Sequence, residues 1–137
     1  MGTWSTLPFG NDDAADWAYE LEDADDLAPI EEAMSVVLAV GDAYLEAFEA
    51  AAAVAAIELL TCLVGRPGDT ETYTEAADAW LKRIEIKPPD ALMNQARLVL
   101  SRILSDDSEL HELWRDGEDY DQWLDVMADL RARTADN

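Results

Sequence analysis

The sequence is poor in positive charge, and its first half has none. Of its 137 residues only nine are Lys or Arg, against 31 Asp and Glu, so the formal net charge is -22. Residues 1–65 contain no Lys or Arg, and the first cation is Arg66. A field of this sign repels nucleic acid and anionic membranes, and it attracts cationic molecules on close approach. We therefore expect a basic protein partner, with no nucleic acid and no membrane bound.

Cysteine is also scarce, because Cys62 is the single one in the chain. This excludes an internal disulfide and fits a reducing compartment. Cys62 lies in an apolar run and is predicted to pack as a small hydrophobic residue. The N-terminus lacks the basic start and apolar run of a signal peptide. The most apolar window, residues 47–64, carries two Glu and indicates a buried helix. We expect a cytoplasmic protein.

The usual catalytic and metal-binding motifs are missing. His111 is the single histidine, and Ser108 stands three residues before it, where a di-iron bundle would have Glu. The sequence has no HExxH motif, no calcium-binding loop and no Gly-rich phosphate loop after a strand. We interpret His111 as a surface residue of a short amphipathic helix. The sequence predicts no catalytic residue, no metal site and no cofactor, although the acids at 23–26 could hold a divalent cation loosely.

Helical spacing of apolar residues runs through most of the chain. Half of the residues are apolar, which is enough for a core. Apolar side chains recur at i, i+3, i+4 and i+7 in successive segments, and no segment convincingly predicts a strand. The helices are expected at about 11–24, 29–41, 43–64, 72–84, 89–103, 108–117 and 120–130. The sequence therefore predicts an all-α protein, a compact bundle of six to seven helices forming one domain over residues 1–137.

Several residues mark the ends of these helices. Asn11 is a predicted N-cap, and Thr72 with Glu75 forms a capping-box pattern; Asp106, Asp107 and Ser108 are alternative caps for the helix that ends at 117. Gly41 is a plausible helix stop, and the Gly-Arg-Pro-Gly run at 65–68 is the strongest loop signal. The tryptophans lie on or beside the inward stripes and are predicted to be core residues: Trp4, Trp17, Trp80, Trp114 and Trp123.

The opening GTWSTLPFGNDDAADW resembles the start of a bacterial family, domain of unknown function 4259. The matching residues are Gly2, Trp4, Pro8, Phe9, Asn11, Asp12, Ala14, Asp16 and Trp17. The Ala-rich segment and the C-terminal Ser-Glu-Leu and Trp-Leu segments are similar to the same family, so the resemblance covers nearly the whole chain. It implies no activity, because the family has none established. Phe48 stands where many relatives have Pro, which implies that the central helix extends further towards the N-terminus.

Two features favour a binding function over an enzymatic one: the cation-free first half and the missing catalytic motifs. We predict a non-enzymatic acidic protein-binding module. In its sharper form it is an immunity or inhibitor protein that masks a basic toxin or a nucleic-acid-handling enzyme. The predicted partner-binding patch is Asp16, Glu20, Asp23, Asp25 and Asp26. The alternatives are a homo-oligomeric structural subunit and a carboxylate- or metal-dependent enzyme. Salt adaptation or a GC-rich genome would equally explain the acidic excess.

Overall fold

Helices make up the fold, as the sequence predicts. The computed structural model describes residues 6, 8–66, 68 and 73–135. Within these residues there are seven α-helices and one 3-10 helix. They are α1 Asp12–Ala18, η1 Tyr19–Asp23, α2 Ala28–Ala39, α3 Ala47–Leu63, α4 Glu75–Arg83, α5 Asp90–Ile103, α6 Glu109–Arg115 and α7 Tyr120–Arg133. The predicted all-α helical bundle is confirmed.

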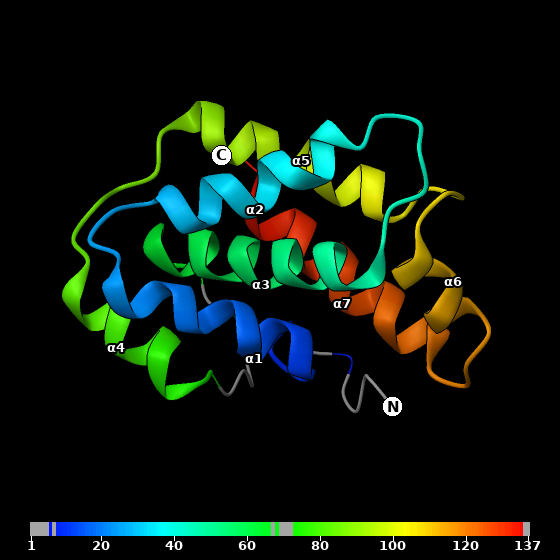
Figure 1. Ribbon diagram of the computed structural model, residues 1–137, viewed down its shortest axis with the longest axis horizontal. Coiled ribbons are helices and arrows are strands. Elements are labelled where there is room, and N and C mark those ends of the chain that lie inside the picture. Colours follow the sequence, from blue (N-terminus) through cyan, green and yellow to red (C-terminus); the bar gives the residue numbers. More distant parts are fainter. Residues whose placement is uncertain (1–5, 7, 67, 69–72, 136–137) are drawn as a thin grey trace.

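Helix α3 lies at the centre of the bundle (Figure 1). Its sequence is apolar nearly all round, so it has no face suited to solvent. From Ala50 to Thr61 every residue except Ala52 is buried. The six other α-helices all contact α3, and its alanines allow their backbones to approach closely. The central position predicted from the Ala-rich segment is therefore correct.

The first predicted helix, 11–24, divides into two parts. Asn11 caps α1 as predicted, and its side chain accepts a hydrogen bond of 2.8 Å from the amide of Ala14. The α-helix ends at Ala18, and the chain tightens into η1. The carbonyls of Leu21 and Ala24, at the end of this turn, accept hydrogen bonds from the Arg83 guanidinium at 2.7 and 2.8 Å. Arg83 of α4 thus donates hydrogen bonds to carbonyls that would accept them from backbone amides if the helix continued.

Helix α3 begins at Ala47 and not at 43. The preceding Leu45 forms a parallel bridge with Ser108, through the hydrogen bond from its amide to the Asp107 carbonyl at 2.8 Å. This extended backbone is incompatible with a helix through 45. The Glu109 carboxylate then accepts a hydrogen bond from the Ala47 amide at 2.8 Å and caps the helix from outside. The backward extension implied by Phe48 is therefore wrong.

The other helix ends follow the predicted chemistry, with one change. Helix α4 is capped by Thr74, whose hydroxyl accepts from the Ala77 amide at 3.2 Å, whereas the predicted cap Thr72 lies outside the described residues. Gly41 and Gly65 both have positive φ, of 62° and 80°, at the ends of α2 and α3. A residue with a side chain adopts this conformation at a cost, which explains the stop signals.

The buried apolar residues form one cluster, and every α-helix contributes at least one residue to it. Trp17, Trp80 and Trp123 belong to it, and Trp114 packs against it, as predicted; Trp4 lies outside the described residues. Leu113 of α6 is 56% exposed. No helix in the described part of the chain is both long and apolar enough to cross a membrane.

Candidate functional site

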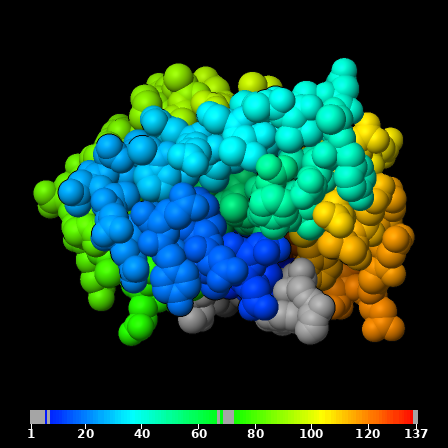
Figure 2. All heavy atoms as spheres, in the orientation of Figure 1, coloured from blue at the N-terminus to red at the C-terminus, as the bar shows by residue number. Residues whose placement is uncertain are grey.

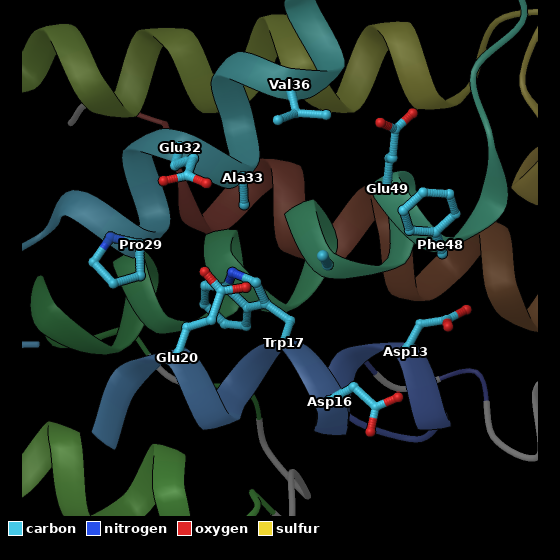
Figure 3. A pocket seen from close by; sticks show the side chains of 11 residues that line it. Asp13, Asp16, Trp17, Glu20, Pro29, Glu32, Ala33, Val36, Phe48 and Glu49 are labelled. Carbon is cyan, nitrogen blue, oxygen red and sulfur yellow. The ribbon is translucent and has the colours of Figure 1, made fainter. Parts of the chain in front are cut away.

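A groove of about 370 Å³ opens between α1 and α2. Figure 2 shows it as a hollow in the face where the blue α1 and the lighter blue α2 lie over the green α3. Both outer helices pack against α3, so the start of α3 forms the floor between them (Figure 3). The lining residues are Asp13, Asp16, Trp17, Glu20, Pro29, Glu32, Ala33, Val36, Phe48, Glu49 and Ala52.

The two walls of the groove are helical stripes with the same spacing. On α1 and η1 the lining positions are 13, 16, 17 and 20, and on α2 they are 29, 32, 33 and 36. Both sets follow i, i+3, i+4, i+7, which places side chains on one face of a helix. The stripe on α1 and η1 therefore presents three carboxylates beside Trp17, and the stripe on α2 presents Glu32 beside three apolar side chains.

The floor of the groove is apolar, and part of it is exposed. Trp17 is only 7% exposed and closes the floor beneath α1. Ala33 and Ala52 add small side chains that leave room above them. Phe48 is 54% exposed and Val36 is 37% exposed. An aromatic ring half in solvent beside an apolar floor is a surface that a partner can cover.

The rim of the groove carries charge of one sign. Five carboxylates line it, and among the described residues no Lys, Arg or His does. The nearby cations are engaged at the ends of the elements: Arg83 with the backbone of η1, and Arg102 with the carbonyls of Gly41 and Ala43. All residues that line the groove belong to the half of the sequence without Lys or Arg, and they combine an acidic rim with an apolar floor.

The predicted patch is divided by the structure. Asp16 and Glu20 line the groove. Asp26 instead accepts a hydrogen bond from the Ala28 amide at 3.0 Å at the start of α2, and Asp25 lies 3.6 Å from Arg83. Asp23 is exposed on η1 and does not line the groove. The groove therefore includes two of the five predicted residues and leaves out Asp23, Asp25 and Asp26.

Three groove carboxylates were missed: Asp13, Glu32 and Glu49. For Asp13 the signal was available, because it shares helical spacing with Asp16 and Glu20. For the other two no local pattern could have helped. Their place at the groove depends on how α2 and α3 pack beside α1.

A second polar cluster is buried between α3 and α7. The Glu58 side chain is fully buried, and Arg133 reaches both of its oxygens, at 2.8 and 3.0 Å. Tyr73 and the Gly68 amide donate further hydrogen bonds to the same carboxylate, at 2.8 and 3.1 Å. The carboxylate is enclosed by its own partners, so this cluster joins the two helices and the connection after α3.

Cys62 belongs to this polar cluster and is not the purely apolar packing residue that was predicted. Its sulfur lies 3.0 Å from the Tyr73 hydroxyl and 3.6 Å from Glu58. Burial raises the pKa of the Cys62 thiol to about 11, against a smaller lowering by the hydrogen bond with Tyr73. The pKa of the Tyr73 hydroxyl is raised as well, chiefly by burial. A thiol in this state is a poor nucleophile at neutral pH.

His111 is buried, so its predicted surface position is wrong. It is 8% exposed, and its ring lies parallel to those of Tyr120 and Trp123. Nδ1 lies 3.0 Å from the Ser105 carbonyl and Nε2 lies 2.7 Å from the Tyr120 hydroxyl. Since the carbonyl only accepts, Nδ1 carries a proton and donates to it. Nε2 thus links α6 to α7, and Nδ1 links α6 to the connection between α5 and α6.

Metal ligands do not gather anywhere in the described part of the chain. No group of three or more His, Cys, Asp or Glu side chains there has the arrangement to hold a metal ion. The loose cation site considered for the acids at 23–26 has no support in this arrangement, since Asp26 caps a helix and Asp25 faces Arg83.

Comparison with known proteins gives one match. A family model described as Domain of unknown function (DUF4259) matches residues 2–126. No curated protein and no solved structure matches the chain.

Proposed function

The chain belongs to the DUF4259 family, and we propose that it is a non-enzymatic acidic module that binds a basic protein through the groove between α1 and α2. The observation that carries this proposal is the groove itself. It combines five carboxylates, no lining cation among the described residues and an apolar floor with an exposed phenylalanine. Protein interfaces commonly have this form, an apolar centre within a polar rim.

The sharper form of the proposal is an immunity or inhibitor protein. An acidic rim attracts a basic partner over the last few ångströms and orients it, and the apolar floor then holds it in place. A basic toxin or a nucleic-acid-handling enzyme presents Lys and Arg where it binds phosphates. Carboxylates along a groove wall would occupy those cations and mask the partner's site.

The test is a pair of charge-reversal variants. Asp16, Glu20 and Glu32 are exposed and line the groove, and they are replaced together by Lys. The matched control replaces Glu85, Glu118 and Asp125, which are exposed and do not line it. Immobilised wild-type protein and both variants are used to capture partners from a lysate of the native organism at low salt.

We expect the wild type and the control variant to retain the same basic protein in stoichiometric amount. The groove variant should lose it, because the reversed charges repel Lys and Arg. If the groove variant and the control variant retain the same proteins, the groove is not the binding site. If all three retain only scattered cationic proteins that elute early in a salt gradient, the negative charge acts nonspecifically and the proposal is wrong.

A further inference from the structure

We infer that the groove takes one amphipathic α-helix of the partner, with apolar side chains on the face that enters the groove and Lys or Arg along its flanks. This rests on the proposed function and adds the form of the binding element. It follows from the dimensions of the groove, from the backbone groups it offers and from its charge.

The groove has the length of a short helical segment. Each lining stripe spans eight residues, from 13 to 20 on one wall and from 29 to 36 on the other. At a rise of about 1.5 Å per residue, a stripe is about 10 Å long, or about two helical turns. A volume of about 370 Å³ holds a few side chains and not a whole helix. The partner helix therefore lies along the rim and inserts its apolar side chains.

The walls favour a helix over an extended peptide. An extended peptide gains affinity by pairing its backbone with the free edge of a sheet. The groove has helices on both sides, and helices use their backbone groups internally, so it offers no such edge. What it offers is side-chain surface: an apolar floor with three carboxylates on the wall formed by α1 and η1, and with Glu32 and Glu49 from α2 and α3. This surface complements a helix with an apolar stripe at i, i+3, i+4 and i+7.

The charge favours a cationic partner over a second copy of this chain as the occupant. A second copy carries the same net charge of -22. Its first half has no Lys or Arg to pair with the rim. A helix with Lys or Arg on both sides of its apolar stripe meets carboxylates from α1 on one wall and Glu32 from α2 on the other. Charge complementarity thus selects a cationic partner.

Phe48 is the anchor on the floor of the groove. It stands in the first turn of α3, and Figure 3 shows its ring at one end of the groove, beside Glu49. Its exposed fraction of 54% means that a bound helix would bury a large aromatic surface there. Buried aromatic side chains near the centre of an interface contribute much of its binding energy.

The test uses two synthetic peptides of the same composition. One, about 18 residues and five helical turns long, places Leu at i, i+3, i+4 and i+7 and Lys or Arg on both flanks. The other has the same residues in an order that spreads Leu around the helix. Binding is measured by fluorescence anisotropy of labelled peptide at about 150 mM NaCl, where charge alone acts only at short range. The Cα chemical shifts of the isotope-labelled peptide report whether it is helical when bound.

Two protein variants separate the apolar contact from charge. Phe48→Ala removes the anchor, and Leu98→Ala removes an equally exposed apolar residue of α5 that does not line the groove. We expect the amphipathic peptide to bind as a helix and to bind about tenfold or more weakly to Phe48→Ala, with no change for Leu98→Ala. The scrambled peptide should bind at least about tenfold more weakly than the amphipathic one.

Two other outcomes would contradict the helix inference, and the second of them would also contradict the proposed function. If both peptides bind equally and Phe48→Ala has no effect, but the groove charge reversal still weakens them, the helix inference fails and the acidic binding groove stands. If the groove charge reversal weakens neither peptide, the helix inference and the proposed function both fail.

Discussion

Glu58 is a charged residue in the interior, and Arg133 is the cation that compensates its charge. The carboxylate is fully buried, and Arg133 lies 2.8 Å from one of its oxygens and 3.0 Å from the other. Arg133 also donates to the Thr61 hydroxyl and to the Arg66 carbonyl, at 3.0 and 3.2 Å. Removing one member of a buried ion pair leaves the other charge without compensation.

We therefore expect Arg133→Met to lower the free energy of unfolding by about 3–5 kcal/mol. Urea denaturation followed by circular dichroism measures it. Arg115→Met is the control, because Arg115 is exposed at the end of α6, and its replacement should change the free energy by less than about 0.5 kcal/mol. Equal effects of the two replacements would show that the buried pair does not stabilise the fold.

The reactivity of Cys62 provides a second prediction at this scale. With the pKa of the thiol at about 11, about one thiol in a thousand is ionised at pH 8, against about one in four for a free thiol. We expect iodoacetamide to alkylate Cys62 in the folded protein more than about a hundredfold more slowly than it alkylates glutathione. Mass spectrometry of quenched samples measures the rate. Alkylation at the rate of glutathione would mean that the thiol is neither buried nor paired.

The same thiol makes stability depend on alkaline pH. Its pKa is higher in the folded than in the unfolded chain, so folding holds the proton more tightly. The stabilisation is complete below the unfolded pKa of about 8.5 and is lost as the pH rises through about 11. Cys62→Ser cannot ionise in this range. We expect the urea midpoint of the wild type to fall relative to that of Cys62→Ser between pH 8 and 11. A constant difference between the two midpoints would contradict the raised pKa.

At the scale of elements, the groove depends on how well α1 is fixed. The helix has only seven residues, too few to be stable alone. Asn11 caps it at 2.8 Å, and Trp17 fastens it to the core. Asn11→Ala should lower the free energy of unfolding by about 1 kcal/mol, whereas Asn11→Asp should preserve it because Asp caps equally well. Urea denaturation of both variants measures the difference. The cap is unimportant if the two replacements have the same effect.

Helices and their caps were predictable because their causes are local. Asn11, Ser108 and Gly65 act on the backbone within a few residues of themselves. The position of His111 was not predictable, because the rings that bury it, Tyr120 and Trp123, belong to the next helix. Local spacing on α6 cannot show which of its faces is covered.

The groove could be predicted from the sequence only in part. The spacing of Asp13, Asp16 and Glu20 is visible in the sequence and predicts an acidic face on α1. The opposite wall is visible only as a separate stripe on α2, and the sequence does not show that α3 holds the two walls apart. The start of α3 was misplaced for the same reason. Its extended neighbour Leu45 pairs with a segment 63 residues later in the chain, at Ser108.

At the scale of the whole molecule, negative charge works against compactness. The net charge is -22, so the carboxylates of the folded domain repel one another, and salt screens this repulsion. Each replacement of Asp or Glu by Lys changes the charge by two units, so either triple reversal changes it by six, from -22 to -16. Both triple variants should therefore unfold at temperatures equal to or above that of the wild type at low salt.

The measurement is the melting temperature at about 20 mM and about 500 mM NaCl. We expect the melting temperature of the wild type to rise more with salt than that of either variant. The two variants should behave alike, since they share one net charge. A low melting temperature confined to the groove variant would show that its carboxylates stabilise the fold and are not free for a partner.

The arginines of this chain serve its own backbone. Six of the seven donate hydrogen bonds to main-chain carbonyls: Arg66, Arg83, Arg97, Arg102, Arg131 and Arg133. Arg83 and Arg102 each join two or more carbonyls, which a branched guanidinium can do and a lysine ammonium on a flexible stem does poorly. Natural variation should therefore be uneven over the surface. Exposed acids that lie outside the groove and hold no helix end are free to change among Asp, Glu and neutral residues, whereas an exchange of Arg for Lys, conservative in charge, would release a loop from the bundle.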